Sequence, residues 1–290
     1  MRLLKPLVFG LVAMGFVASC TPTNTGPATG SARKAEIGQS EQLVAELRRR
    51  KLLNQDARLK RYVDSVGRRI AKQRPKGAPR IRAFVINDPG VNAFTTGGGY
   101  VFFNAGLLAV LENEAQFAMV FAHELAHVDR GHVTEGARNR SNVGLGATAL
   151  AIGAAVAGVP ADLAQAVVGV GAQAAVAGFT REQETDADRI GFQYLSGAGY
   201  NAAAGAKSFR VLRDLYGDRG GFLATHPQSS ERQKLIQGLA RRNDAKSGRV
   251  GRDDYLRATN NLRRQAIKFY ETNDRPREAR QAKRNLRRLR

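Results

Sequence analysis

Apolar residues recur at helical spacing through the first part of the chain. From Ser40 onward, the run SEQLVAELRRRKLLNQDARLKRYVDSVGRRIAKQR places apolar residues every three or four positions. That period is typical of amphipathic helices, so we expect helical structure up to the run RPKGAP, which ends the pattern. The apolar positions that carry this prediction are Leu43, Leu47, Leu59, Val63, Val66 and Ile70.

Two segments after RPKGAP favour strands. RIRAFVIND alternates in the manner of a strand, and VNAFTTGGGYVFFN suggests a further pair of strands. The run Gly97-Gly98-Gly99 is either a hairpin turn or a strand edge that another backbone can approach closely.

A buried helix is predicted in the middle of the chain. A short helix over residues 105–112 precedes a longer one from about Glu114 to Ala137. Its centre, AQFAMVFAHELAHV, is apolar on nearly all sides, which is typical of a helix buried in a core. The patterns together predict an α+β fold, mostly helical, with a small antiparallel sheet beside this buried helix.

Residues 143–179 consist largely of Ala, Gly and Val, interrupted at Pro160 and Asp162. We interpret them as a hairpin of two small-residue helices packed on the protein, since small residues allow close helix packing. Membrane insertion and a mobile cover over a cleft are the alternatives. Helices with glycine-rich breaks follow Thr180, and residues 241–290 are expected to be a basic helical C-terminal extension that can form a helical hairpin.

The N-terminus predicts export. Arg2 and Lys5 precede an apolar stretch from Leu7 to Val17, which is shorter than an ordinary spanning helix. The following VASC resembles the lipobox of bacterial lipoproteins, which implies lipidation of Cys20, the only cysteine. An ordinary signal peptide with an incidental cysteine is the alternative.

These features divide the chain into four expected parts. Residues 1–19 are a lipoprotein signal peptide, residues 20–39 a flexible tether, residues 40–240 the main domain and residues 241–290 the extension. By the sorting rule for such lipoproteins, Thr21 in place of Asp implies anchoring to the periplasmic side of the bacterial outer membrane.

The charge of the chain favours anionic partners. It has 46 Lys and Arg against 25 Asp and Glu, a net charge of +21, and the extension holds 17 of the former and six of the latter. Such a chain is attracted to polyanions. Because an exported protein does not meet chromosomal DNA, we expect contact with anionic lipid through the basic extension and no nucleic-acid partner.

The sequence HELAH is the strongest candidate for a metal-binding, catalytic motif. Residues four apart lie on one face of a helix, so His123 and His127 can offer two imidazoles to one metal ion. Glu124 is offset around the helix and can reach a water on the metal, which is the pattern of a zinc hydrolase with a glutamate base. His132 falls one residue short of the spacing that draws a third ligand from the same stretch, so a structural role suits it better.

A third ligand can come from REQETDADRIG. Glu184 can complete a His₂Glu site that leaves a position for water, and Asp188, one turn later, can orient a ligand histidine. The alternative is an acidic helix N-terminus favoured by the helix dipole, which suits Glu182 best.

Four motifs in combination give the chain a family resemblance. NAFTTGGGYVFFNAGLL, HELAH, REQETDAD and ATHP resemble the gluzincin family of HtpX-like and CAAX-prenyl-protease-like zinc metallopeptidases, over roughly residues 40–240. Within that family the chain is most similar to the BepA-like periplasmic and outer-membrane lipoprotein members.

The resemblance implies roles for individual residues. One Zn²⁺ per chain would be held by His123, His127 and Glu184, with Glu124 as the catalytic base and Asp188 orienting a ligand. His226 would be a regulatory fourth ligand or an oxyanion donor; its alternative is a loop histidine before a helix. The residues implied to bind substrate as an added strand are Gly98, Gly99, Tyr100, Val101 and Phe102.

The resemblance also implies a function. We expect a zinc-dependent endopeptidase of the cell envelope that acts on misfolded or stalled envelope and outer-membrane proteins in protein quality control. The alternative is a non-catalytic, chaperone-like scaffold for outer-membrane protein assembly. Two departures limit the comparison: TTGGG replaces the family's apolar-Pro-Gly-Gly, and about 50 basic residues stand where BepA-like members have a long helical-repeat domain.

Overall fold

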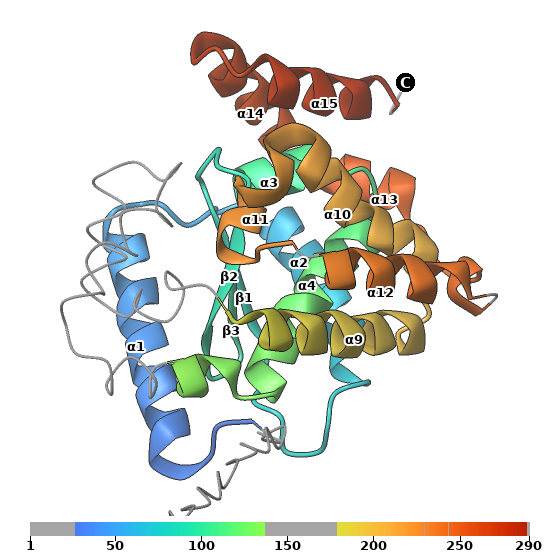
Figure 1. Cartoon of the computed structure of the whole chain (residues 1–290). Helices are drawn as coiled ribbons and strands as arrows, with labels where there is room; N and C mark the ends of the chain where they lie inside the picture. The colour runs from blue at the N-terminus through green and yellow to red at the C-terminus, as the bar shows by residue number, and fades with distance from the viewer. Residues whose placement is uncertain (1–26, 137–178, 229, 243, 289–290) are drawn as a thin grey trace, which may run out of the picture.

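The computed structural model describes residues 27–136, 179–228, 230–242 and 244–288. The signal peptide, Cys20 and all of the predicted helical hairpin over residues 143–179 except Phe179 lie outside these ranges. Helices dominate the described part, and a three-stranded sheet lies beside the central helix α4 (Figure 1). The predicted fold class is confirmed. In the described residues no helix is long and apolar enough to cross a membrane.

The first half of the chain contains the sheet and the helices around it. Its elements are α1 (Gly30–Arg49), α2 (Ala57–Ala71), β1 (Arg82–Ile86), β2 (Ala93–Gly97), β3 (Tyr100–Asn104), α3 (Ala105–Val110) and α4 (Glu114–Asp129). The second half is helical: α9 (Arg181–Gly197), α10 (Ala202–Tyr216), α11 (Phe222–Thr225), α12 (Ser230–Arg241), α13 (Arg252–Ala258), α14 (Asn260–Thr272) and α15 (Pro276–Arg287).

Side-chain caps fix the starts of the helices that build the site. The Asn113 side chain accepts a hydrogen bond from the backbone N–H of Gln116 at the start of α4. Thr180 and Gln183 form a reciprocal capping box at the start of α9. These caps satisfy backbone donors that have no partner within the helix, so each helix begins at a defined residue.

Two helix boundaries differ from the sequence prediction. Helix α1 begins at Gly30, so residues 30–39, expected to belong to the tether, form its first turns. Helix α4 ends at Asp129, eight residues before the predicted end at Ala137. The chain turns at Gly131, whose φ of +70° lies in the left-handed region that an α-helix cannot contain, and a new helical turn follows.

The sheet is mixed, whereas the sequence predicts an antiparallel one. Strand β3 lies in the centre, antiparallel to β2 and parallel to β1. The prediction was wrong for the β1–β3 pair, because residues 87–92 carry the chain past β3 to the opposite edge of the sheet before β2 begins.

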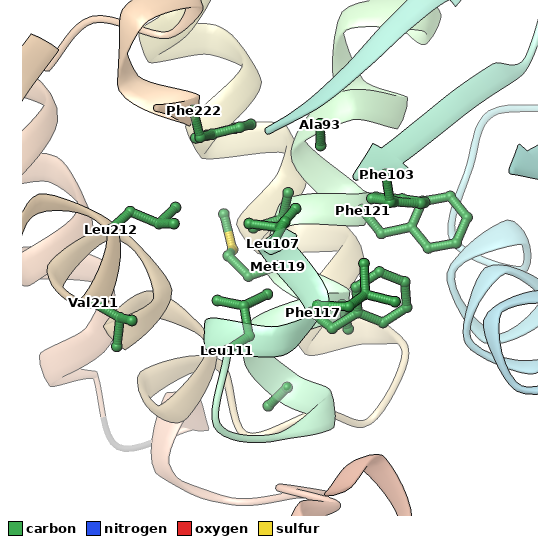
Figure 2. Close-up of a cluster of buried hydrophobic side chains, with 14 of the residues drawn as sticks. Ala93, Phe103, Leu107, Leu111, Phe117, Met119, Phe121, Val211, Leu212 and Phe222 are labelled. Atoms are coloured by element: carbon green, nitrogen blue, oxygen red, sulfur yellow. The ribbon is translucent and has the colours of Figure 1, made fainter. Parts of the chain in front are cut away.

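One apolar core joins the sheet to the helices (Figure 2). The ring of Phe103 on β3 packs edge-on against Phe117 and Phe121 of α4, with both centroid distances 4.9 Å. On the other side, Met119 of α4 faces Leu212 of α10. All five side chains are fully buried. Helix α4 is therefore surrounded by packed side chains, as its apolar sequence predicts.

The basic C-terminal extension is packed against α3. The last carbonyls of a helix have no partner within that helix. Side chains from the extension donate hydrogen bonds to the carbonyls of residues 108–111, at and just beyond the end of α3. The donors are Tyr255, Arg263, Gln281 and Asn285. Helices α14 and α15 also pack against each other as a hairpin at the top of the molecule (Figure 1).

We predict that Asn285→Ala lowers the free energy of unfolding by about 2 kcal/mol, measured by chemical denaturation. The Asn285 amide is buried and donates to the carbonyls of Val110 at 3.0 Å and Leu111 at 3.1 Å, and unpaired buried carbonyls are costly. Gln265→Ala, at an exposed position on α14, is the control. Equal stabilities of the two variants would show that these hydrogen bonds contribute nothing.

Candidate metal centre

Close packing of α9 on α4 forms the site. A Cβ atom built on Gly191 of α9 would lie 3.0 Å from the backbone nitrogen of His123, which is tighter than almost all Cβ contacts, so glycine at this position favours the close approach of the two helices. Glu184 and Asp188 lie on the turns of α9 before Gly191 and reach the side chains of α4. Both carboxylates are fully buried, as are His123, Glu124 and His127.

Four side chains offer ligand atoms to one point. His123, His127, Glu184 and His226 each place a nitrogen or oxygen within 4.8 Å of the others, and we call these four residues the metal cluster. The structure thus brings His226, 103 residues away along the chain from His123, to the three residues predicted to bind zinc.

The spacing of these atoms suits zinc. The Nε2 atoms of His123 and His127 are 3.1 Å apart, and they lie 3.5 and 3.4 Å from the Glu184 carboxylate. His226 Nδ1 lies 3.2 Å from His123 Nε2 and 2.9 Å from Glu184 Oε1. Ligand atoms in a tetrahedral zinc site are about 3.3 Å apart, given metal–ligand distances near 2.0 Å. The donor set therefore fits one zinc ion.

Further contacts fix the orientation of the two histidines of α4. The Asp188 carboxylate lies 3.1 Å from Nδ1 of His123. Nδ1 of His127 lies 3.0 Å from Nδ1 of His132, which stays outside the metal cluster. The ring of Phe179 stacks on His127 with a centroid distance of 3.6 Å. These contacts leave the Nε2 atoms of both histidines directed at the cluster.

Glu124 and Glu184 have opposite environments. No side chain in the described part forms a hydrogen bond with the Glu124 carboxylate. Nε2 of His226 lies 3.3 Å from it, and burial raises the pKa of Glu124. Burial acts in the same direction on Glu184, but the charges of His226 and Arg232 hold the pKa of Glu184 well below its usual range. Two carboxylates whose pKa values are shifted in opposite directions suit different tasks: proton transfer for Glu124 and metal ligation for Glu184.

Arg232 is a buried site residue that sequence reasoning does not find. From α12, its guanidinium donates two hydrogen bonds to Asp188, at 2.6 and 2.9 Å, and lies 2.6 Å from Glu184. It also donates to the backbone carbonyls of His226 and Pro227. It thus offsets the charge of the two buried carboxylates of α9, Glu184 and Asp188, and holds the loop that carries His226. A single arginine in a polar helix has no distinctive spacing that would have revealed it.

The prediction that a substrate pairs with residues 98–102 as an added strand places the substrate at the wrong strand. Tyr100, Val101 and Phe102 belong to β3, whose two edges are paired with β1 and β2, so an added strand cannot hydrogen-bond there. Gly98 and Gly99 form the turn before β3.

That turn is covered by α1. The N–H of Gly98 donates to the Glu36 carboxylate at 2.8 Å, and a Cβ atom on Gly98 would lie 2.8 Å from the Ile37 side chain. The glycine run is therefore both a hairpin turn and a place of close approach. Of the β2–β3 pair, only β2 has an outer edge within the sheet.

Comparison with known proteins agrees with this geometry. The family described as "Peptidase family M48" matches residues 55–240. The "Beta-barrel assembly-enhancing protease" of Escherichia coli (strain K12) is 31% identical over 245 residues, 79% of this chain and 49% of the relative. The "Mitochondrial metalloendopeptidase OMA1" of Arabidopsis thaliana is 30% identical over 180 residues, 59% of this chain and 36% of the relative.

A shorter relative also matches. The "Metalloprotease LoiP" of Escherichia coli (strain K12) is 33% identical over 151 residues, 51% of this chain and 58% of the relative. The chain spans about half the length of the curated relatives it matches.

We predict that Arg232→Gln lowers the free energy of unfolding by about 3 kcal/mol, because it leaves the buried charges of Asp188 and Glu184 without their cation. Chemical denaturation of the metal-free protein measures the change. Arg241→Gln, at an exposed position on the same helix, is the matched control. A loss below about 0.5 kcal/mol, the usual range for surface substitutions, would contradict the role assigned to Arg232.

Proposed function

Because this chain belongs to peptidase family M48, a family of zinc metallopeptidases, we propose that it is a zinc-dependent endopeptidase acting on proteins of the cell envelope. The observation that carries the proposal is the metal cluster, fully buried and adjacent to a carboxylate, Glu124, that has no hydrogen-bond partner among the described residues.

His123, His127 and Glu184 would hold the ion. Bound zinc supplies a Lewis acid that acidifies water and polarises the scissile carbonyl. Glu124 takes a proton from the attacking water and delivers it to the leaving amine, a role suited to a carboxylate whose pKa burial raises. Asp188 keeps His123 in the orientation that presents Nε2, and Arg232 keeps Asp188 in place.

His226 makes the resting enzyme latent in this proposal. Its Nδ1 lies within the metal cluster, where the fourth position of a catalytic zinc site is open to water or substrate. The ring stacks on Phe222 at 4.2 Å, and α11 and the loop after it carry both residues. Substrate entry then requires His226 to leave the cluster, after which its imidazole is available to stabilise the oxyanion.

The proposed substrate class and location come from the sequence and from a relative's name. The E. coli relative is named for enhancing β-barrel assembly, and we propose misfolded or stalled outer-membrane proteins as substrates here. The lipobox-like VASC supports a lipid anchor at Cys20 after removal of residues 1–19, with residues 20–29 as the tether and the protein on the periplasmic side of the outer membrane.

We predict that Glu184→Gln and Glu124→Gln separate zinc binding from catalysis. Loss of the Glu184 carboxylate should reduce zinc affinity by more than tenfold. Glu124→Gln should retain one zinc per chain yet cut an unfolded protein such as casein at least 100-fold more slowly, the scale of general acid–base catalysis. Metal analysis and cleavage assays measure the two effects, and Glu182→Gln, exposed on α9, is the matched control.

The same assays test the alternatives. His226→Ala should increase cleavage if the histidine holds the enzyme latent, and decrease it if its main role is to stabilise the oxyanion. Cleavage by Glu124→Gln at the parent rate would sink the assignment of the base. If that variant lacks cleavage yet fully replaces the parent in cells, the non-catalytic scaffold becomes the better description.

We predict that Cys20→Ala abolishes incorporation of a fatty-acid analogue and moves the protein from the outer-membrane fraction to the soluble periplasm. The reason is that lipid attachment to this sulfur is the proposed anchor. Thr23→Ala, which lies just beyond the lipobox, should keep both the label and the location. Labelling that survives Cys20→Ala would eliminate the anchor.

A further inference from the structure

A second concave region lies between α2 and β1 and includes no residue of the metal cluster. Its volume is about 700 Å³, within the range of small-molecule sites. Its wall is formed by the last turns of α1, one side of α2, the loop after α2 and the start of β1. The cationic residues in this wall are Arg48, Lys60, Arg68, Arg74, Arg80 and Arg82. We call this region the basic cavity.

Among the described residues, Asp64 is the one carboxylate that lines the basic cavity. Asp64 pairs with Lys60 at 2.5 Å. Arg74 turns away to form a buried bidentate pair with Asp129, at 2.8 and 2.6 Å. These two pairs neutralise two of the six cations, so the charge of the cavity comes from the other four.

The remaining four arginines have no carboxylate within 4.0 Å in the part of the chain that the structure describes. They are Arg48, Arg68, Arg80 and Arg82. They come from α1, α2, the loop and β1, so their convergence results from the fold rather than from one charged run of sequence.

Tyr100 links two of these arginines. The guanidinium of Arg82 lies over the Tyr100 ring, 4.9 Å from its centroid. Burial raises the pKa of the Tyr100 hydroxyl, and the charges of Arg82 and Arg48 act in the opposite direction. Cations from α1 and β1 therefore lie near one hydroxyl group, which also donates a hydrogen bond to the Glu41 carboxylate at 3.3 Å. Like charges around a concave surface focus a positive potential and attract anions.

We propose that the basic cavity binds a ligand that carries two or more phosphate groups. Guanidinium groups match phosphate oxygens with paired hydrogen bonds, which a lysine ammonium cannot reproduce, and all four unpaired cations are arginines. The volume accommodates more than one phosphate group. A phospholipid headgroup and a soluble polyphosphate offer the same chemistry, so the experiment separates these two sources. The proposal is independent of peptidase activity.

The test is calorimetric titration of the full chain, in a neutral detergent, with pyrophosphate at low ionic strength. The parent should bind with a stoichiometry of one. Arg68→Gln combined with Arg80→Gln should weaken the affinity at least tenfold. Arg264→Gln combined with Arg287→Gln removes the same charge from exposed positions of α14 and α15 and should change it by less than twofold. Both double variants should unfold at the parent's temperature, since all four side chains are exposed.

Two results would overturn the proposal. The first is no pyrophosphate binding, or equal weakening by both double variants, because that indicates only the general attraction of a chain with net charge +21. The second is tighter binding of a glutamate-rich peptide than of pyrophosphate through Arg68 and Arg80, which would assign the cavity to an acidic protein partner.

Vesicles of phosphatidylcholine, with and without cardiolipin, whose headgroup carries two phosphates, identify the source of the phosphate. If the cavity variant loses the preference for cardiolipin and pyrophosphate displaces the parent, the ligand is a lipid headgroup. If vesicle binding is equal in both double variants while pyrophosphate affinity differs, the ligand is a soluble phosphate compound. Either result supports a phosphate site.

Discussion

The contact between α4 and α9 is the constraint on which the site depends. Gly191 allows α9 to lie directly against the backbone at His123, and a side chain there would push the helices apart. At the observed distance the two carboxylates reach the two ring nitrogens of His123, Glu184 at Nε2 and Asp188 at Nδ1. Because catalysis depends on atomic positions to a fraction of an ångström, a larger separation would disrupt ligation and orientation together.

Bringing these carboxylates together out of water carries a large desolvation cost, which the surrounding structure must offset. Arg232 offsets part of it with hydrogen bonds to Asp188 and a close ion pair with Glu184. The same guanidinium bonds the backbone at His226, so the position of that loop is coupled to the charge of α9. Movement of His226 out of the cluster therefore requires rearrangement at Arg232.

The sequence predicted the residues of the site better than their surroundings. HELAH and the helix with Glu184 and Asp188 are recognisable because ligands on a helix must follow its period. Arg232 and Gly191 have no such period; their importance comes from contacts between helices distant in sequence. The location of the sheet edge was missed for a related reason: alternation identifies β3 as a strand but carries no information on which neighbours it pairs with.

Of the sequence features, the net positive charge is the one most easily overinterpreted. The excess of Lys and Arg suggests polyanion binding by the C-terminal extension, yet two of the largest fully buried side chains in the described structure are Arg232 and Arg263. Arg263, within that extension, donates to the carbonyl of Ala109 and caps α3. A net charge counts such buried arginines equally with exposed ones. The extension therefore serves first as part of the fold, and an anion is better sought where arginines converge without carboxylate partners, as they do between α2 and β1.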